Sequence, residues 1–163
     1  MGSRYQQNRN DWVFRRSRAD YACYAEFKID EITNALNYIT SFEGKYTLGS
    51  IDLKTKVDKV ELVLDQAIPC GLLVNELITN ALKYAFPEDR PGKIFLGLTE
   101  KQTQIELEIS DDGVGMPEGF SILNSDTLGL QLVNTLVEQL DGEIRVENSG
   151  GIKYLITFEK AKI

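Results

Sequence analysis

One stretch, residues 65–86, limits the fold more than any other part of the sequence: DQAIPCGLLVNELITNALKYAF. Its apolar residues recur every three or four positions, as on one face of an α-helix, and that face consists of Val74, Ile78, Ala81 and Ala85. Proline is tolerated in the first turn of a helix but not in its interior. Pro69 therefore predicts a helix start nearby, and Pro87 and Pro91 predict its end. Such a long amphipathic helix needs an apolar surface on which to pack.

Strand-like segments on both sides of this helix can provide that surface. Before it, residues 51–57 alternate apolar and polar side chains, and a second short strand is expected at Val60–Leu64. After it, two strands are expected at Lys93–Thr99 and Gln104–Ser110. The second of these alternates as a half-buried strand does, with apolar side chains at Ile105, Leu107 and Ile109.

The remaining sequence predicts a second helix and a hairpin. Residues 128–141 have helical spacing and end before Gly142, and the side chains expected to face inward are Leu132, Val133, Leu136, Val137 and Leu140. Strands at 143–147 and 152–159 are expected to pair through a turn at Asn148–Gly151. Helices mixed with antiparallel hairpins predict an α+β fold, a two-layer α/β sandwich with helices packed on one face of a mixed, largely antiparallel sheet.

The N-terminal part differs from the rest in its charge. Residues 1–24 contain five arginines and two aspartates, a net charge of +3, which leaves −10 for the remainder of a chain whose total is −7. We expect residues 1–25 to be a basic, aromatic leader, either a truncated upstream segment or a start added to the chain. Residues 26–43 have apolar side chains at helical spacing, so residues 26–50 are predicted to form a linker helix.

Composition excludes several classes of function. The chain has no histidine, which excludes a Ser-His-Asp triad, a zinc site with histidine ligands and self-contained phosphohistidine chemistry. An acidic body is a poor partner for nucleic acid, whose phosphates dominate binding. The sequence shows no transmembrane stretch or secretory signal, so no membrane contact is expected. Cys23 and Cys70 are far apart and are predicted to be free thiols in a reducing, cytoplasmic compartment.

Polar residues occupy the opposite face of the predicted helix at 65–86. Glu76 and Asn80 are one turn apart and project side by side. A carboxylate can hold or deprotonate a nucleophile, and an amide oxygen is a neutral ligand suited to Mg²⁺. Lys83 adds a positive charge for phosphate oxygens, and Tyr84 adds an aromatic surface. Taken alone, a solvated helix face would explain the same pattern.

Two glycine-containing motifs follow this helix. The sequence DDGVG at residues 111–115 comes directly after an alternating strand. Its first carboxylate can accept a hydrogen bond from an exocyclic amine such as that of adenine, and its glycines allow the backbone to approach a flat base. The sequence TLGLQLV at residues 127–133 places Gly129 at the start of a helix, where unpaired backbone N–H groups can bind phosphate. Each motif alone is also consistent with an ordinary turn or helix start.

Together, the three motifs resemble the ATP-binding fold of the GHKL superfamily, which includes gyrase B, the Hsp90 chaperones, the MutL repair proteins and the histidine kinases. NELITNALKYAF is similar to an N box, DDGVGMPEG to a first glycine box and TLGLQLV to a second. The similarity is closer still to one branch of sensor histidine kinases, through IPCGLLVNELITNALKYAFPE and LGLQLVNTLVEQLDG. It covers about residues 51–160, and it implies that residues 51–163 form an ATP-binding catalytic domain.

The resemblance implies a role for each residue of the N-box-like helix. Glu76 would stand where the family places its catalytic carboxylate or an equivalent amide. Asn80 would coordinate Mg²⁺. Lys83 would contact the phosphates and assist catalysis, and Tyr84 would line the base.

The two glycine motifs would complete this nucleotide site. Asp111 would bind the adenine amine, with Gly113 and Gly115 shaping the base pocket. An ATP lid of roughly residues 117–128 would be bounded by residues that bind the cofactor, namely Leu128, Gly129 and Leu130. This lid contains no lysine or arginine, although many relatives place a basic residue there.

The implied activity is transfer of the γ-phosphoryl group of ATP to a histidine on a separate dimerisation domain of the same kinase, with a response regulator downstream. Because the chain lacks that histidine, we expect it to be the catalytic part of a longer sensor kinase. Two alternatives stay open at this point. One is an anti-sigma-factor-like serine kinase of the same fold, and the other is a nucleotide-binding module without catalysis.

Overall fold

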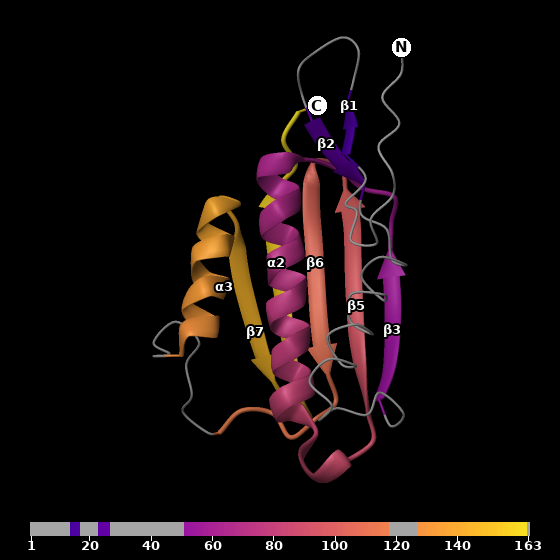
Figure 1. The fold of residues 1–163 in the computed structure, drawn as a ribbon, viewed down its shortest axis with the longest axis vertical. Helices are drawn as coiled ribbons and strands as arrows, with labels where there is room; N and C mark the ends of the chain where they lie inside the picture. Colours follow the sequence, from indigo (N-terminus) through magenta and orange to yellow (C-terminus); the bar gives the residue numbers. More distant parts are fainter. Residues whose placement is uncertain (1–13, 17–22, 27–50, 118–126, 163) are drawn as a thin grey trace, which may run out of the picture.

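The computed structural model describes residues 14–16, 23–26, 51–117 and 127–162. The main sheet has five strands in the order β3-β5-β6-β8-β7, and Figure 1 shows β3, β5 and β6 side by side. Their bounds are Ile51–Val57 for β3, Gly92–Lys101 for β5, Gln104–Asp111 for β6, Glu143–Asn148 for β7 and Ile152–Glu159 for β8. Strand β3 runs parallel to β5, and the other neighbours are antiparallel. The sheet is therefore mixed and largely antiparallel.

Two helices cover one face of this sheet, as Figure 1 shows. Helix α2 spans Leu64–Asn80 and continues directly into a π-helical turn, η2, at Ala81–Ala85. Helix α3 spans Leu128–Gln139 and packs beside α2. A short 3-10 turn, η3, follows η2 at Pro87–Asp89. The predicted two-layer α+β sandwich is confirmed, and so is the long helix at 65–86, apart from the π-helical turn at its end.

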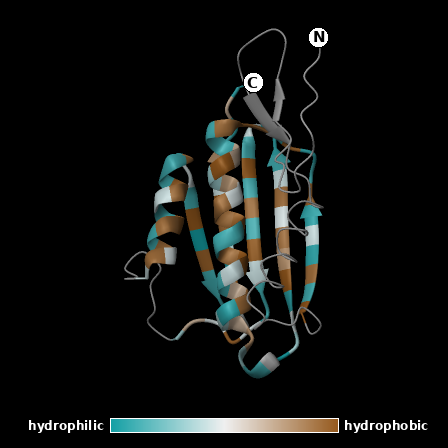
Figure 2. Ribbon diagram, in the orientation of Figure 1, coloured by the Kyte–Doolittle hydropathy of each residue, from teal (hydrophilic) through white to brown (hydrophobic). Residues whose placement is uncertain are grey.

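The core lies between the helices and the sheet. Alternate residues of β5, β6 and β8 face it, and Figure 2 shows hydrophobic and hydrophilic residues alternating along β6. The buried side chains are Ile94, Leu96, Leu98, Ile105, Leu107, Ile109, Tyr154, Ile156 and Phe158 from the sheet, and Leu73, Val74, Leu77 and Ile78 from α2. Full burial of one large aliphatic side chain contributes about 1.5–3 kcal/mol, so this layer is the main source of stability.

A second, small sheet joins the N-terminal region to the start of α2. It has the order β1-β2-β4, with β1 at Phe14–Arg16, β2 at Cys23–Glu26 and β4 at Glu61–Val63. The short strand predicted at Val60–Leu64 therefore exists, and its pairing partner is β2. Of the helix predicted at 26–43, the structure describes only Glu26, and this residue is the end of strand β2. The rest of the predicted helix lies outside the described residues.

Two details of the helices differ from the sequence prediction. Pro69 lies inside α2, more than a turn after its start at Leu64. The helix loses one backbone hydrogen bond there, and the proline itself is buried. Leu132 was predicted to face inward but is 40% exposed. The buried stripe of α3 runs through Leu130, Val133 and Val137 instead, which turns Leu132 toward solvent.

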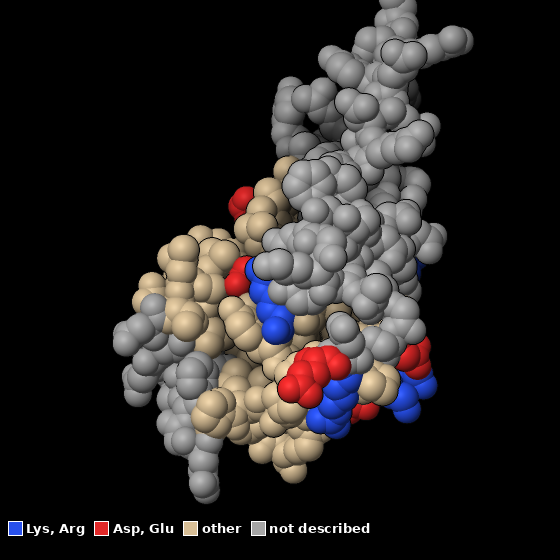
Figure 3. Space-filling view, turned by 60° about the horizontal axis from the view of Figure 1, so that its bottom comes forward, with Lys and Arg blue, Asp and Glu red and all other residues tan. Residues whose placement is uncertain are grey.

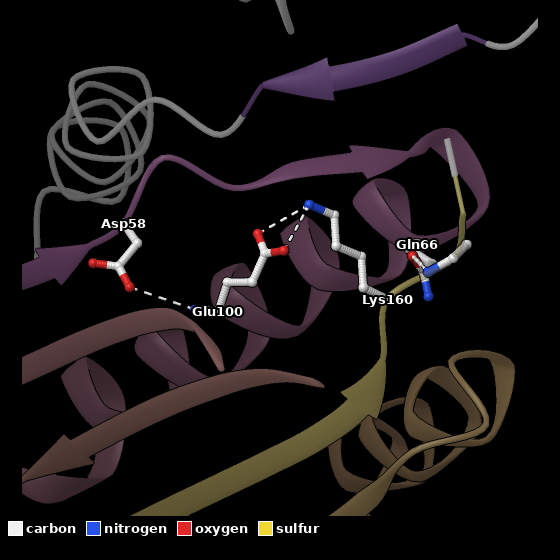
Figure 4. Close-up of polar contacts among 5 residues, drawn as sticks. Asp58, Gln66, Glu100 and Lys160 are labelled. Carbon is white, nitrogen blue, oxygen red and sulfur yellow. Dashed lines mark hydrogen bonds and ion pairs between the residues drawn. The ribbon is translucent and has the colours of Figure 1, made fainter. Parts of the chain in front are cut away.

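Polar contacts fasten the chain after β8 at the end of the sandwich where α2 begins (Figure 4). Lys160 Nζ lies 2.9 Å and 3.0 Å from the two carboxylate oxygens of Glu100. Gln66 of α2 donates to the carbonyl of Glu159 at 2.7 Å and accepts from the N–H of Ala161 at 3.0 Å. Asp58 accepts from the N–H of Glu100 at 3.4 Å. The sequence motifs lie at the opposite end of the sheet.

Among the described residues, no helix is long and apolar enough to cross a membrane. Cys70 is a free, buried thiol, as predicted; burial raises its pKa to about 12. The side chain of Cys23 lies outside the described part of the structure.

Candidate functional site

The first turn of α3 lies against the polar side of α2. A Cβ atom on Gly129 would overlap Glu76 Oε1, and it would lie 3.9 Å from Asn80 Nδ2. Glu76 and Asn80 are both half-buried. Because glycine has no Cβ, the backbone at the start of α3 approaches the carboxylate and the amide closely. The structure thus brings together the polar helix face and the second glycine motif, which are far apart in the sequence.

Asp111 is the last residue of β6, at the same end of the molecule. Its Oδ1 atom accepts hydrogen bonds from the backbone N–H of Gly113 at 2.9 Å and of Ile152 at 3.4 Å. Burial raises the pKa of Asp111 above its ordinary value, the two backbone hydrogen bonds lower it, and the charge of Asp112 raises it further. The carboxylate is therefore held in one orientation by the backbone on both sides of it.

The segment after Asp111 packs against the π-helical turn. The N–H of Val114 donates to the carbonyl of Ala85 at 2.9 Å, and a Cβ on the buried Gly113 would overlap the backbone of Ala85. The last carbonyls of a helix have no partner inside it, so Ala85 is available to accept this bond. The first glycine motif is thereby fixed to the end of the helix that bears Glu76 and Asn80.

The turn between β7 and β8 contacts the same segment at two points. A Cβ on Gly151, whose φ is +119°, would overlap the carbonyl oxygen of Asp111. Asn148 accepts from the N–H of Met116 at 3.0 Å and donates to its carbonyl at 2.9 Å. Sequence reasoning assigned Asn148 and Gly151 only to a hairpin turn. The Gly150-Gly151 pair was the one signal that the turn has an unusual backbone.

Tyr154 is a further residue that the sequence did not single out. It lies on β8, two positions after Ile152, and it is 4% exposed. Burial raises its pKa to about 12, and the charge of Asp111 adds to the shift. A tyrosine at an inward position of an alternating strand looks like any core residue, so the pattern gave no sign of its closeness to Asp111.

The structure does not join every predicted site residue to this group. Lys83 and Tyr84 lie on η2 and are exposed, Tyr84 by 71%. Leu128 is 82% exposed, whereas Leu130 is buried in the core. Among the described residues, no hydrogen bond or ion pair links Lys83 or Tyr84 to the other predicted site residues. Most of the expected lid at 117–128 lies outside the described part of the chain.

Charges at this end of the molecule are mixed in sign. Figure 3 shows acidic and basic side chains side by side on the face it presents, without one broad basic patch among the residues described. The described residues also contain no group of three or more cysteine, aspartate or glutamate side chains placed to hold a metal ion.

Comparison with known proteins gives this arrangement a family. Residues 65–162, more than half of the chain, match the family described as "Histidine kinase-, DNA gyrase B-, and HSP90-like ATPase". The chain belongs to this family. As a member, it contains a nucleotide-binding domain of the histidine kinase type.

Curated relatives of this ATPase domain include two bacterial kinases. Sensor histidine kinase PdtaS of Mycobacterium tuberculosis strain H37Rv is 32% identical over 108 residues, which cover 63% of this chain and 22% of the relative. Blue-light-activated histidine kinase 2 of Erythrobacter litoralis is 32% identical over 123 residues, covering 75% of this chain and 34% of the relative. The chain thus spans between a fifth and about a third of the length of these relatives.

A solved structure has the same fold. The histidine kinase domain from the Erythrobacter litoralis EL346 blue-light activated histidine kinase superposes with a TM-score of 0.71 at 28% sequence identity. The similar region covers 80% of this chain and 60% of that one. The ATPase fold therefore holds for most of the chain.

Proposed function

We propose that this chain is the ATP-binding catalytic domain of a two-component sensor histidine kinase. It transfers the γ-phosphoryl group of ATP to a histidine on a separate dimerisation domain of the same kinase. The observation that carries the proposal is the meeting of three distant motifs, with Gly129 against Glu76 and Asn80, and Gly113 against the end of the same helix. The two relatives, which are both named histidine kinases, favour this activity over a serine kinase or a non-catalytic module.

In this proposal, Asp111 recognises the adenine base. Its Oδ1 atom is occupied by the two backbone N–H groups, which leaves Oδ2 to accept a hydrogen bond from the exocyclic amine. Gly113 and Gly115 shape the base pocket by letting the segment after Asp111 pack directly against Ala85 and Asn148. Tyr84, which is exposed on η2, lines the base from the side of the helix.

The phosphates lie at the start of α3. Backbone N–H groups around Leu128, Gly129 and Leu130 have no partners inside the helix and present the positive end of its dipole. Lys83 supplies a positive side chain, which matters because the expected lid contains no lysine or arginine.

The residues present fit a magnesium ion that the nucleotide brings with it. Mg²⁺ is commonly bound by one or two protein oxygens together with substrate phosphates, and Asn80 offers one amide oxygen beside the position of the phosphates. The absence of a carboxylate cluster among the described residues agrees with this mode. When bound, the ion would neutralise charge on the phosphates.

Glu76 acts on the incoming histidine. An imidazole nitrogen attacks the γ-phosphorus, the bond from that phosphorus to the bridging oxygen breaks, and ADP leaves. Glu76 orients the imidazole and accepts the proton from its other nitrogen. The remaining contribution is positioning of the two reactants, as in phosphoryl transfer generally.

In this proposal, residues 51–163 act as the catalytic domain. A response regulator receives the phosphoryl group from the dimerisation domain. We place the protein in the cytoplasm, where ATP is present, with no membrane or nucleic-acid contact by this part.

A phosphotransfer assay with separated domains tests the proposal. With γ-labelled Mg-ATP, this chain should label an added dimerisation domain that bears the phosphoacceptor histidine, and acid should remove the label. The chain alone should bind nucleotide and acquire no label, because it has no histidine. An acid-stable label on this chain or on the partner would contradict the proposal in favour of a serine or threonine kinase. Nucleotide binding without any transfer would favour a non-catalytic module.

A further inference from the structure

The turn between β7 and β8 holds the segment 111–116 at both ends. At the first end, the N–H of Ile152 donates to Asp111 Oδ1 at 3.4 Å, and Gly151 lies directly against the carbonyl of Asp111. At the second end, Asn148 forms two hydrogen bonds with the backbone of Met116. Between these points the segment has two further attachments. Asp112 exchanges hydrogen bonds with the backbone of Lys93, at 3.2 Å and 2.6 Å, and its carbonyl accepts from Arg90 at 3.5 Å. Val114 donates to the carbonyl of Ala85.

The contact at Asn148 is unusual because one side chain satisfies both backbone groups of one residue. The amide oxygen accepts from Met116 N–H at 3.0 Å and the amide nitrogen donates to Met116 C=O at 2.9 Å. Asn148 is an exposed residue at the end of β7, so this side chain does not contribute to the core. Its polar atoms are directed at the loop that follows Asp111.

The backbone conformation of Gly115 depends on its close contact with Asn148. Its φ is +72°, a region that favours glycine, and a Cβ on it would lie 2.5 Å from Asn148 Oδ1. The loop therefore bends at Gly115 directly under the asparagine side chain, and Met116 is then held in place by the two hydrogen bonds. Without them, the backbone from Val114 to Met116 would keep only one hydrogen bond to the described residues, from Val114 to Ala85.

We infer that Asn148 is a positioning residue for nucleotide recognition, acting through the segment 111–116. Gly113 N–H sets the angle of the Asp111 carboxylate, and Gly113 belongs to the segment that Asn148 holds. When the hydrogen bonds of Asn148 are lost, the segment becomes looser and the Asp111 carboxylate can reorient. The affinity that is lost is then the part contributed by the hydrogen bond to the adenine amine. The inference rests on the proposed function and extends it to a residue outside the three sequence motifs.

Nucleotide titrations with the full chain test this role. Calorimetry should compare ADP with inosine diphosphate, which has the same phosphates and ribose but lacks the exocyclic amine. We expect Asn148→Ala to weaken ADP binding roughly ten-fold, in keeping with the loss of two hydrogen bonds. Binding of inosine diphosphate should change much less, so the preference for ADP should fall. Ser149→Ala, in the same turn and without a hydrogen bond to the described residues 111–116, is the matched control and should retain the preference.

A second variant separates the role from a general effect on folding. Asn148→Asp keeps an acceptor for Met116 N–H but places a carboxylate oxygen against the Met116 carbonyl in place of the donor, so we expect a loss of ADP preference at least as large as that of Asn148→Ala. If Asn148→Ala does not fold, the Asp variant carries the test. An unchanged ratio of ADP to inosine diphosphate affinity in the folded variants would overturn the inference and leave the proposed function intact. Failure of the wild-type chain to bind ADP would instead overturn the proposed function.

Discussion

At the scale of the single residue, two opposing effects act on the pKa of Asp111. Burial penalises its charge and raises its pKa, whereas the N–H groups of Gly113 and Ile152 favour the charged form. Both backbone bonds go to one oxygen atom, and Oδ2 accepts no hydrogen bond from the described residues. Asp111 is half-buried, and an oxygen without a protein donor can accept a hydrogen bond from a ligand, so this atom is suited to a ligand with a donor group.

Replacing Asp111 with asparagine should remove nucleotide recognition and keep the fold. The amide oxygen can still accept from Gly113 and Ile152, which turns the amide nitrogen, a donor, toward the adenine amine. We expect ADP affinity to fall about ten- to a hundred-fold, from the loss of a charge-assisted hydrogen bond. Calorimetry measures the affinity, and the melting temperature checks the fold. Unchanged ADP affinity in a folded variant would remove Asp111 from the site.

Glu76 and Asn80 should separate catalysis from binding, although they are neighbours. Asn80→Ala should abolish the Mg²⁺ dependence of ATP binding, because an amide ligand is lost. Glu76→Ala should bind ATP nearly as well as wild type and transfer phosphate to an added dimerisation domain about 10²–10⁴-fold more slowly, as expected for loss of a general base. Titrations with and without Mg²⁺ and single-turnover labelling measure the two effects. An equal loss of binding in both variants would make Glu76 structural.

At the scale of elements, the β7–β8 turn shows how two adjacent glycines can have different importance. Gly150 has a φ of +67° and open space around its Cβ position, whereas Gly151 has a φ of +119° and lies against the carbonyl of Asp111. Alanine at Gly150 should reduce the free energy of unfolding by about 1–2 kcal/mol, the cost of a left-handed backbone. Alanine at Gly151 should cost roughly 3 kcal/mol or more, because the carbonyl must also move. Urea unfolding measures both, and equal losses would show that the close approach is unimportant.

The elements themselves were largely predictable, and their contacts were not. Strands β3, β5, β6 and β8 and both helices have one apolar face, so periodicity identifies them. The pairing of β4 with β2 depends on long-range partners that local patterns do not encode. The same holds at the site: Glu76 and Asn80 are apparent from helical spacing, whereas the Asn148–Met116 contact joins residues 32 positions apart. The π-helical turn at Ala81–Ala85 was also missed, because its residues favour an ordinary helix.

At the scale of the whole molecule, the packed core holds two titratable groups in their neutral forms. Cys70 on α2 and Tyr154 on β8 are 1% and 4% exposed. Burial raises the pKa of Cys70 from 9.0 to about 12. Burial, together with the charge of Asp111, raises the pKa of Tyr154 from 10.0 to about 12. Neither group ionises in the folded chain near neutral pH, so both contribute their full stabilisation there.

This core should make the protein lose stability in alkaline solution. Between pH 9 and 12 the unfolded chain releases protons from Cys70 and Tyr154 that the folded chain still holds, so the free energy of unfolding falls as pH rises. Since one pKa unit is worth about 1.4 kcal/mol, Tyr154 alone accounts for a fall on the order of 2 kcal/mol. Tyr154→Phe should therefore flatten the decline above pH 10 in urea unfolding followed across this range. Tyr84→Phe removes the same hydroxyl from an exposed position and should leave the decline as steep as in wild type; an equally steep decline in Tyr154→Phe would show that this tyrosine is not the group that titrates.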